Sequence, residues 1–384
     1  MAIKVSRRGN ISPFIVMDVM RDANKREADG ENILHLEVGQ PCTSAPIQVL
    51  NVAREKLKKD VIGYTDALGL PALKRRIVKH YDEFYGEKIL PSQVVVTTGS
   101  SGGFILAFLS AFDPGDRVAL ACPGYPAYRN ILKSVNVEAI NLQTGFETNF
   151  QPNPELLDRT AVSGPLDGLI VASPSNPTGT MIQADEFKAL VDYCEKKSIR
   201  LISDEIYHGI TYGNTAETAL KFSKNSIVIN SFSKYFSMTG WRLGWMIVPN
   251  DLQRSIECLA QNLFISPPTL SQFAAIKAFD CQKELKGHVE RYAENRELLL
   301  AQLPKAGFET LAPVEGAFYV YAYIGNLTND SQEFCQRMLA ETAVAATPGT
   351  DFDPERGSRY MRFSFAGDTQ SISQAMERLI HWKK

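Results

Sequence analysis

The segment Ser231-Phe-Ser-Lys234-Tyr-Phe-Ser-Met-Thr-Gly-Trp241-Arg242-Leu-Gly-Trp245 directly follows the apolar run Ile227-Val-Ile-Asn230. Such a run is typical of a buried strand, so the segment should begin where a strand of a sheet ends. It places Lys234 among small hydroxyl residues, and Arg242 follows eight positions later. A lysine in this setting can attack a carbonyl group while the arginine and the hydroxyls hold a phosphate. Taken alone, however, the segment fits a solvated lysine on an ordinary loop better.

Size and composition predict a soluble protein of two parts. The chain has 384 residues, more than one compact core usually holds, which favours a large domain and a smaller one. Hydrophobic residues make up 44% and charged residues 22% of the chain, as in ordinary soluble proteins. The net charge of −2 and the lack of a basic stripe argue against nucleic acid as a partner. No apolar run is long enough for a membrane span, and the N-terminus lacks the apolar centre of a signal peptide.

The cysteines and histidines predict neither disulfides nor a metal. The six cysteines are scattered and form no C-x-x-C pair, which indicates reduced thiols and a cytoplasmic location. The five histidines show no ligand spacing, so we expect no metal site.

Short apolar runs alternate with helical patterns through the middle of the chain. This alternation predicts a mostly parallel sheet covered by helices on both faces. The predicted strands are Val94–Thr98, Arg117–Ala121, Gly168–Ala172, Arg200–Ser203, Ser226–Asn230 and Gly244–Val248. The predicted helices are Pro46–Lys59, Pro71–Tyr85, Ser101–Phe112, Ala184–Lys197 and a long one from about Leu270 to Leu303.

The two ends of the chain predict a second unit. After about residue 285 the composition becomes more charged, and strands are predicted over Glu315–Tyr321 and Tyr360–Phe365. The stretch up to about Glu37 precedes the sheet, and we expect it to pack with that unit. The expected division is therefore an N-terminal segment over 1–37, a large domain over 38–285 and a small domain over 286–384.

Several predicted strands end in segments suited to a ligand, which in open α/β sheets binds outside the carboxyl ends of the strands. Gly99-Ser-Ser-Gly-Gly103 leads straight into a helix, so its free N–H groups suit a phosphate, although a plain strand-to-helix turn fits equally well. Tyr125 lies between two prolines and can either stack on an aromatic cofactor or fill the core.

Two further strand ends carry polar side chains. Prolines flank Asn176, which fixes its amide in one orientation or simply forms a turn. Asp204 follows the strand at 200–203, where a buried carboxylate is costly unless it is paired. A pyridinium N–H would be a suitable partner, and a salt bridge or a helix cap are the alternatives.

The order and spacing of these segments resemble the class I/II aminotransferases of the aspartate aminotransferase superfamily, over nearly the whole chain from Ser12 to Arg362. These are pyridoxal-phosphate enzymes of fold type I. The resemblance implies a large cofactor-binding domain, with a mostly parallel seven-stranded sheet between helices. It also implies a smaller α+β domain formed from both chain ends.

The resemblance gives each motif a role toward pyridoxal 5'-phosphate. Lys234 is similar to the lysine that forms a Schiff base with the cofactor and then shuttles a proton. Asp204 is similar to the aspartate that pairs with the pyridine nitrogen, and Tyr125 to the aromatic residue that stacks on the ring. Tyr207 and Asn176 resemble the pair beside the phenolic oxygen. The implied phosphate site comprises Ser100, Ser101, Gly102, Ser231, Ser233 and Arg242.

The resemblance also implies an amino acid and a 2-oxo acid as substrates. Arg362 is similar to the arginine that takes the substrate carboxylate in a fork, with Gly39 and Asn176 beside it; otherwise it forms a surface ion pair. Tyr64 resembles the tyrosine that reaches the phosphate of the neighbouring subunit, which implies a homodimer; otherwise it is a core aromatic residue.

Substrate choice is less clearly encoded. Bacterial relatives that use aspartate often have a lysine where Ser101 stands, and its absence favours a neutral or hydrophobic amino acid. Arg7, Arg8 or the partner subunit would have to supply another cation for an acidic side chain. Candidates for an apolar pocket, or else for plain core packing, are Phe14, Ile15 and Phe318.

Two other functions use the same fold. A carbon–sulfur lyase would use the same lysine, aspartate and arginines. A non-catalytic regulator that binds pyridoxal phosphate would carry an additional DNA-binding domain, for which 384 residues leave no room.

Overall fold

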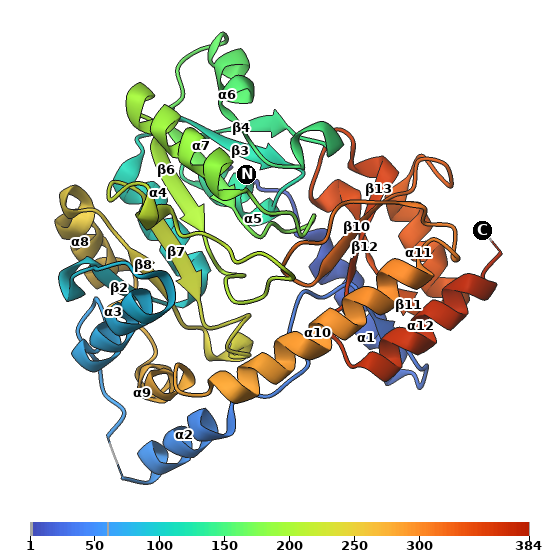
Figure 1. The fold of residues 1–384 in the computed structure, drawn as a ribbon, viewed down its shortest axis with the longest axis horizontal. Helices are drawn as coiled ribbons and strands as arrows, with labels where there is room; N and C mark the ends of the chain where they lie inside the picture. The colour runs from blue at the N-terminus through green and yellow to red at the C-terminus, as the bar shows by residue number, and fades with distance from the viewer. Residues whose placement is uncertain (1–2, 60, 384) are drawn as a thin grey trace.

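A seven-stranded sheet forms the centre of the computed structural model, which describes residues 3–59 and 61–383 (Figure 1). Its strands are β2 (Val94–Thr97), β3 (Arg117–Cys122), β4 (Glu138–Gln143), β5 (Gly168–Ala172), β6 (Arg200–Asp204), β7 (Ile227–Ser231) and β8 (Gly244–Ile247). They lie in the order β2-β8-β7-β6-β5-β3-β4. Strand β8 is antiparallel to both of its neighbours, and the other paired strands are parallel. The predicted mostly parallel sheet is therefore confirmed.

Helices cover both faces of this sheet, because successive residues of a strand point to opposite sides and both sets are apolar here. Val94 and Val228 face the layer formed by α2 (Ile47–Lys59), α3 (Pro71–Tyr85), α6 (Pro154–Ala161), α7 (Ala184–Lys197) and α9 (Thr269–Ala278). Val95 and Ile229 face the layer formed by α4 (Gly99–Ala111), α5 (Pro126–Ser134) and α8 (Gln253–Leu263).

All six predicted strands are present, and their ends differ from the predicted ends by at most one residue. The edge strand β4 was not predicted. It is mostly half-exposed and carries Glu138 and Asn141, so it lacks the continuous apolar run of the inner strands.

The long helix predicted over 270–303 was wrong, because the structure has two helices there. Helix α9 ends at Ala278, and α10 (Gln282–Gln302) begins after a turn in which the N–H of Cys281 bonds to the carbonyl of Ala278 at 3.2 Å. Neither glycine nor proline stands in the turn, so the sequence carries no stop signal at this point.

The C-terminal part contains a second sheet, antiparallel, in the order β12-β13-β10-β9. Its strands are β9 (Thr310–Leu311), β10 (Tyr319–Tyr323), β12 (Thr347–Pro348) and β13 (Tyr360–Ser364). It packs in one apolar core with α10, α11 (Ser331–Thr342) and α12 (Thr369–His381). Strand β10 begins later than predicted, because Ala317 has a left-handed backbone (φ 57°) that interrupts the extended conformation.

The N-terminal elements lie against this C-terminal part, where Figure 1 shows the blue helix α1 (Ile15–Ala28) beside red strands. Strand β1 (Leu34–His35) pairs in parallel with β11 (Val344–Ala345). Helix α10 runs without a break through the expected boundary at 285, and the division into domains stays a prediction. Within residues 3–59 and 61–383, no helix is both long and apolar enough to cross a membrane.

Candidate active site

A cavity of about 210 Å³ lies where the carboxyl ends of β3, β5, β6 and β7 meet the second sheet. Most of the predicted site residues line it, although they come from seven separate stretches of the chain. Those that line it are Gly39, Ser100, Ser101, Tyr125, Asn176, Asp204, Tyr207, Ser233, Lys234, Arg242 and Arg362. Three predicted residues are not part of the lining: Gly102, Ser231 and Tyr64.

Lys234 projects its amine into this cavity from the loop after β7. Its Nζ donates a hydrogen bond of 2.6 Å to the carbonyl oxygen of Gly39. Burial, together with the nearby cations Arg362 and Arg242, lowers the pKa of Lys234 to about 8, while Asp204 acts in the opposite direction. A lysine with a lowered pKa has more of the neutral amine that nucleophilic attack requires.

Asp204 ends the central strand β6 and is 4% exposed. It accepts hydrogen bonds from the hydroxyl of Tyr128 and, at 3.1 Å, from the N–H of Ile206. Burial raises the pKa of Asp204 to about 6, against the lowering effect of these two donors and of Lys234. Tyr128 was not predicted as a site residue, although it lies in the motif Tyr125-Pro-Ala-Tyr128, one helical turn after the predicted stacking residue.

The start of helix α4 and Arg242 form a cradle with positive potential. A Cβ atom at Gly99 would lie 2.6 Å from Nη2 of Arg242, and Gly99 has a left-handed backbone (φ 75°), so both the close approach and the backbone favour glycine there. Arg242 itself has a left-handed backbone (φ 50°), and its Nη1 donates to the carbonyl of Thr239 at 2.9 Å. The first N–H groups of an α-helix have no partner within the helix, so those of α4 are available to an anion beside Arg242.

Two predicted members of the phosphate site lie behind this cradle. Ser231 is fully buried, and its hydroxyl bonds to the hydroxyl of Ser233 at 2.9 Å and to the carbonyl of Leu243 at 3.1 Å. Gly102 is packed so closely that a Cβ atom would lie 2.5 Å from Oγ1 of Thr98. Both residues therefore lie outside the cavity, and Ser231 contacts the cradle through the hydroxyl of Ser233.

Arg362 lies at the opposite end of the cavity, on β13, and is 2% exposed. Its Nη1 donates to Oδ1 of Asn176 at 2.9 Å, and its Nη2 donates to the carbonyl of Glu37 and to Oγ1 of Thr347. Its buried Nε has no hydrogen-bond partner among the described residues. An unpaired buried N–H is costly, so this guanidinium is ready to bind an oxygen ligand.

A pair of tyrosines connects the two ends of the site. The hydroxyls of Tyr207 and Tyr319 are 2.7 Å apart, and the guanidinium of Arg362 lies 4.4 Å from the centre of the Tyr319 ring. A Cβ atom at Gly39 would lie 1.9 Å from the Tyr319 hydroxyl, which explains the glycine at that position. Tyr319 was not predicted, because nothing local in the sequence relates it to Gly39 or Tyr207.

One side of the cavity is apolar. Phe14, Val16 and Met17, at the start of α1, line it. The expectation for Phe14 as a lining residue is confirmed, whereas Ile15 is not part of the lining and Phe318 is fully buried in the C-terminal core.

Tyr64 lies away from the cavity and is 83% exposed. An exposed tyrosine of this kind is not a core residue, so that alternative for Tyr64 is excluded.

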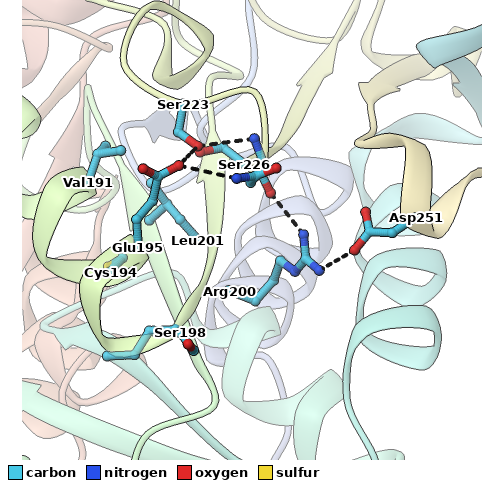
Figure 2. A pocket seen from close by; sticks show the side chains of 11 residues that line it. Val191, Cys194, Glu195, Ser198, Arg200, Leu201, Ser223, Ser226 and Asp251 are labelled. Carbon is cyan, nitrogen blue, oxygen red and sulfur yellow. Dashed lines mark hydrogen bonds and ion pairs between the residues drawn. The ribbon is translucent and has the colours of Figure 1, made fainter.

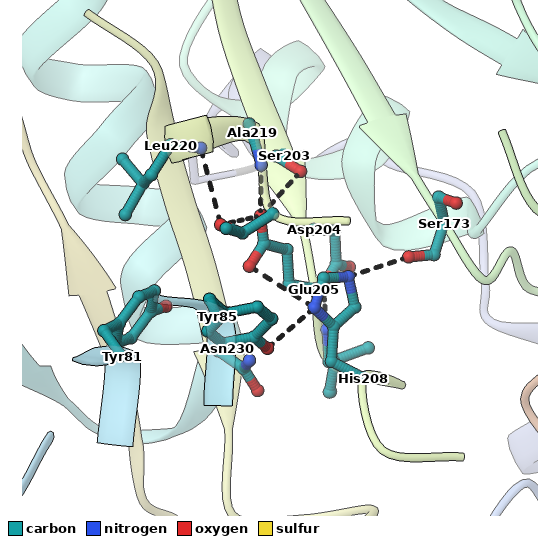
Figure 3. A network of polar contacts seen from close by, with 12 residues as sticks. Tyr81, Tyr85, Ser173, Ser203, Asp204, Glu205, His208, Ala219, Leu220 and Asn230 are labelled. Atoms are coloured by element: carbon teal, nitrogen blue, oxygen red, sulfur yellow. Dashed lines mark hydrogen bonds and ion pairs between the residues drawn. The ribbon is translucent and has the colours of Figure 1, made fainter. Parts of the chain in front are cut away.

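A buried network adjoins Asp204 along the chain (Figure 3). His208 donates from Nε2 to the carbonyl of Ser173 at 3.0 Å, and its Nδ1 lies 2.8 Å from the Tyr85 hydroxyl. Burial raises the pKa of Glu205 to about 8 and lowers that of His208 to about 3, so both are mainly neutral at pH 7. Oε1 of Glu205 accepts from three donors, namely Thr218 Oγ1, Ala219 N and Ser203 Oγ.

A second hollow, of about 280 Å³, lies at the other end of β6 (Figure 2). Its charged groups already have partners: Glu195 accepts from Ser223 and Asn225, and Arg200 pairs with Asp251 at 2.6 Å. It therefore offers no free charged group comparable to Lys234 or Arg362. Across the described part of the chain, no group of three His, Cys, Asp or Glu residues could hold a metal ion.

Comparisons with known proteins agree with this geometry. The family model for aminotransferase class I and II matches residues 31–379. The valine–pyruvate aminotransferase of Mycobacterium tuberculosis is 46% identical, over 100% of this chain and 99% of its own length. The (5-formylfuran-3-yl)methyl phosphate transaminase of Methanocaldococcus jannaschii is 34% identical, over 96% of each chain.

Solved structures are similar over the same extent. An aminotransferase from Mycobacterium tuberculosis has a TM-score of 0.97 at 46% identity and covers 99% of both chains. The aspartate aminotransferase from Thermus thermophilus with maleate has a TM-score of 0.92 at 27% identity, over 98% of this chain and 99% of its own. The match to the family model and the identity to these relatives show that the chain belongs to the class I and II aminotransferases.

Proposed function

We propose that this aminotransferase uses pyridoxal phosphate to move the amino group of a neutral, apolar L-amino acid to a small 2-oxo acid. The observation that carries the proposal is the arrangement in one cavity of the Lys234 amine, the Asp204 carboxylate and the Arg242 cradle. Enzymes of this family and fold use pyridoxal phosphate.

The residues present fit that cofactor. Asp204 is a buried carboxylate that needs a cationic or N–H partner, which the pyridine nitrogen would provide. The N-terminus of α4 and Arg242 suit its phosphate, with Ser100 and Ser233 as hydroxyl donors. The ring of Tyr125 lines the same cavity and would stack on the pyridine ring. Lys234 would bind its aldehyde carbon.

When bound, the cofactor supplies a protonated conjugated ring that accepts the electron pair left when the Cα proton is removed. The negative charge on Asp204 keeps the ring nitrogen protonated, which stabilises the transition state for that step. The amine of Lys234 takes the proton from the Cα atom as a base and returns a proton as an acid. Its lowered pKa, about 8, lies close enough to neutral pH for both tasks.

Arg362 would hold the α-carboxylate of the substrate. Its unpaired Nε points to a missing oxygen ligand, and Asn176 fixes the guanidinium from the side. A carboxylate held in a fork also fixes the orientation of the Cα–H bond, which must stand perpendicular to the ring.

The apolar side of the cavity supports a neutral substrate. Phe14, Val16 and Met17 offer contacts to a hydrocarbon side chain but no group to pair with a second carboxylate. Valine as amino donor and pyruvate as acceptor, the pair in the name of the 46% identical relative, are therefore our first candidates.

A donor and acceptor screen tests this function. The purified protein with pyridoxal phosphate should convert valine and pyruvate into alanine and 2-oxoisovalerate, and should prefer valine to aspartate. Formation of pyruvate and ammonia from an amino acid without any added oxo acid would instead support a carbon–sulfur lyase.

We further propose a cytoplasmic homodimer in which Tyr64 reaches the phosphate site of the partner subunit. The exposed position of Tyr64, away from its own cavity, supports this, and the six free cysteines fit a reducing compartment. Mixing Tyr64→Ala with Lys234→Ala tests it, because each mixed dimer then contains one intact site. In an equal mixture, half of the dimers are mixed and each has one intact site of two. The activity of the mixture should therefore exceed that of either variant alone by roughly a quarter of the wild-type activity. A protein that sediments as a monomer would contradict the proposal.

A further inference from the structure

The first turn of helix α1 is capped by a carboxylate from the other end of the chain. Asp351 lies in the 3₁₀ turn Gly349–Asp351. Its Oδ1 accepts from the N–H of Ile15 at 3.0 Å, and its Oδ2 accepts from the N–H of Val16 at 3.2 Å. The residue before the helix, Phe14, provides no side-chain cap. Because the first N–H groups of a helix lack partners within it, Asp351 stabilises this turn.

The loop that carries Asp351 is itself anchored to helix α5, which covers one face of the large sheet. Arg129, on α5, donates to the backbone oxygens of Asp351 and of Phe352, the second at 3.1 Å. Asp351 is only 2% exposed. Burial raises the pKa of Asp351, while the two helix N–H groups, Arg362 and Arg129 lower it and so favour the charged form. The cap is thus a buried carboxylate in a fixed position, near Arg362 at the substrate end of the cavity.

The capped turn carries the apolar side of the cavity. Phe14, Val16 and Met17 line the cavity, and the ring of Phe14 meets Tyr125 edge-on at a centroid distance of 5.7 Å. A shift of the helix start would move all three side chains together. The groups that we propose for catalysis lie on other elements and would keep their places.

We propose that Asp351 is a positioning residue that sets the side-chain specificity of the enzyme by fixing the start of α1. In this arrangement Phe14, Val16 and Met17 form a wall of defined position for a branched or longer apolar side chain. The proposal rests on the proposed aminotransferase function. Asp351 does not line the cavity, so it acts through the helix.

This role predicts an effect that depends on the size of the substrate. Alanine has a single methyl group and gains little from the wall, whereas valine and leucine bury more apolar surface against it. Loss of the cap should therefore raise KM for the larger donors and leave kcat nearly unchanged, because the wall contributes binding and not chemistry.

The test compares wild-type protein, Asp351→Ala and Asp351→Asn with alanine, valine and leucine as donors and 2-oxobutyrate as the constant acceptor. In Asp351→Ala, KM for valine should rise at least about fivefold more than KM for alanine, with kcat within about twofold of wild type. Asp351→Asn keeps one acceptor oxygen, so its change should be smaller and in the same direction. The control Asp330→Ala removes the corresponding cap of α11, where Asp330 accepts from two helix N–H groups, and should not change the ratio.

A second measurement needs neither cofactor nor turnover. In the protein without cofactor, amide hydrogen exchange at the start of α1 should accelerate at least about threefold in Asp351→Ala but not in Asp330→Ala. If Asp351→Ala does not fold, the amides of Ile15 and Val16 in Asp351→Asn carry this test, since that variant keeps an acceptor for only one of them.

An equal rise in KM for all donors, or unchanged exchange at the start of α1, would overturn the proposal. So would the same change in specificity in Asp330→Ala. A wild-type protein that does not transaminate would overturn the proposed function instead, and the exchange measurement would still decide whether Asp351 holds α1.

Discussion

The amine of Lys234 lies 2.6 Å from the carbonyl oxygen of Gly39, a residue 195 positions earlier in the chain. This contact connects the loop after β7 to the stretch after β1, in which the carbonyl oxygen of Glu37 accepts a hydrogen bond from Arg362. It holds the amine between the cradle at Arg242 and the guanidinium of Arg362, and these two cations contribute to its lowered pKa. With a pKa of about 8, roughly one-tenth of the lysine is neutral at pH 7, against about one part in several thousand for an ordinary lysine.

Arg362→Gln should weaken the binding of every substrate. Loss of a charge-assisted fork to a buried carboxylate costs about 2–4 kcal/mol, so kcat/KM should fall by roughly 30- to 1,000-fold for amino and oxo acids alike. Steady-state kinetics with valine and pyruvate measure this. The control Arg359→Gln changes an exposed arginine of the same region and should have little effect on kcat/KM. If kcat/KM falls by less than a few-fold in Arg362→Gln, Arg362 does not bind the substrate carboxylate.

Tyr128→Phe should shift the pH profile. The hydroxyl of Tyr128 lowers the pKa of Asp204, so its removal should raise that pKa. Asp204 must be charged to pair with a protonated ring nitrogen, and the acid limb of kcat/KM should therefore move to higher pH. We expect kcat to fall by about tenfold. The control Tyr125→Phe removes a hydroxyl that has no direct bond to Asp204, so the acid limb should stay in place. An unshifted acid limb in Tyr128→Phe would contradict the proposal that the Tyr128 hydroxyl keeps Asp204 charged.

Glu205→Gln should stabilise the protein at alkaline pH. The folded-state pKa of Glu205, about 8, is above its ordinary value of 4.5. Its stabilising contribution is therefore complete below pH 4.5 and is lost as pH rises through about 8. Gln keeps the acceptor oxygen but cannot ionise, so the free energy of unfolding at pH 8 should exceed that of the wild type by about 1–3 kcal/mol.

Urea unfolding of the protein without cofactor, at pH 5 and pH 8, measures this difference. It should shrink toward zero at pH 5. The control Glu155→Gln changes a glutamate on an exposed helix surface. Its free energy of unfolding should differ from that of the wild type by the same small amount at pH 5 and at pH 8. A destabilised Glu205→Gln at pH 8 would mean that Glu205 is needed in its charged form.

Much of the site could be predicted from sequence, because most of its residues stand directly after apolar runs. Lys234, Asp204 and Asn176 follow strands of a parallel sheet, and parallel strands bring such positions to one edge. Their convergence in the cavity follows from the strand order alone. Arg362 and Gly39 lie outside this sheet, and only the resemblance to a known family related them to the others.

The residues that were missed depend on packing between distant segments. Tyr128 and Tyr319 are aromatic residues in apolar surroundings, and nothing local distinguishes them from core tyrosines. The hydroxyl partners that give them a role, Asp204 and Tyr207, lie 76 and 112 positions away in the chain. Asp351 is similar, since its contact with the start of α1 joins residues 336 positions apart.

We propose that Lys234 is the nucleophile that binds the aldehyde carbon of pyridoxal phosphate. Incubation with the cofactor, reduction with borohydride, digestion and mass spectrometry locate the labelled lysine. In the wild type we expect the label on the peptide that contains Lys234, and in Lys234→Ala we expect no label at that site. The matched control is Lys74→Ala, because burial also lowers the pKa of Lys74, and this variant should be labelled fully at Lys234. A label of wild-type occupancy on another lysine, or undiminished labelling of Lys234→Ala, would contradict the claim.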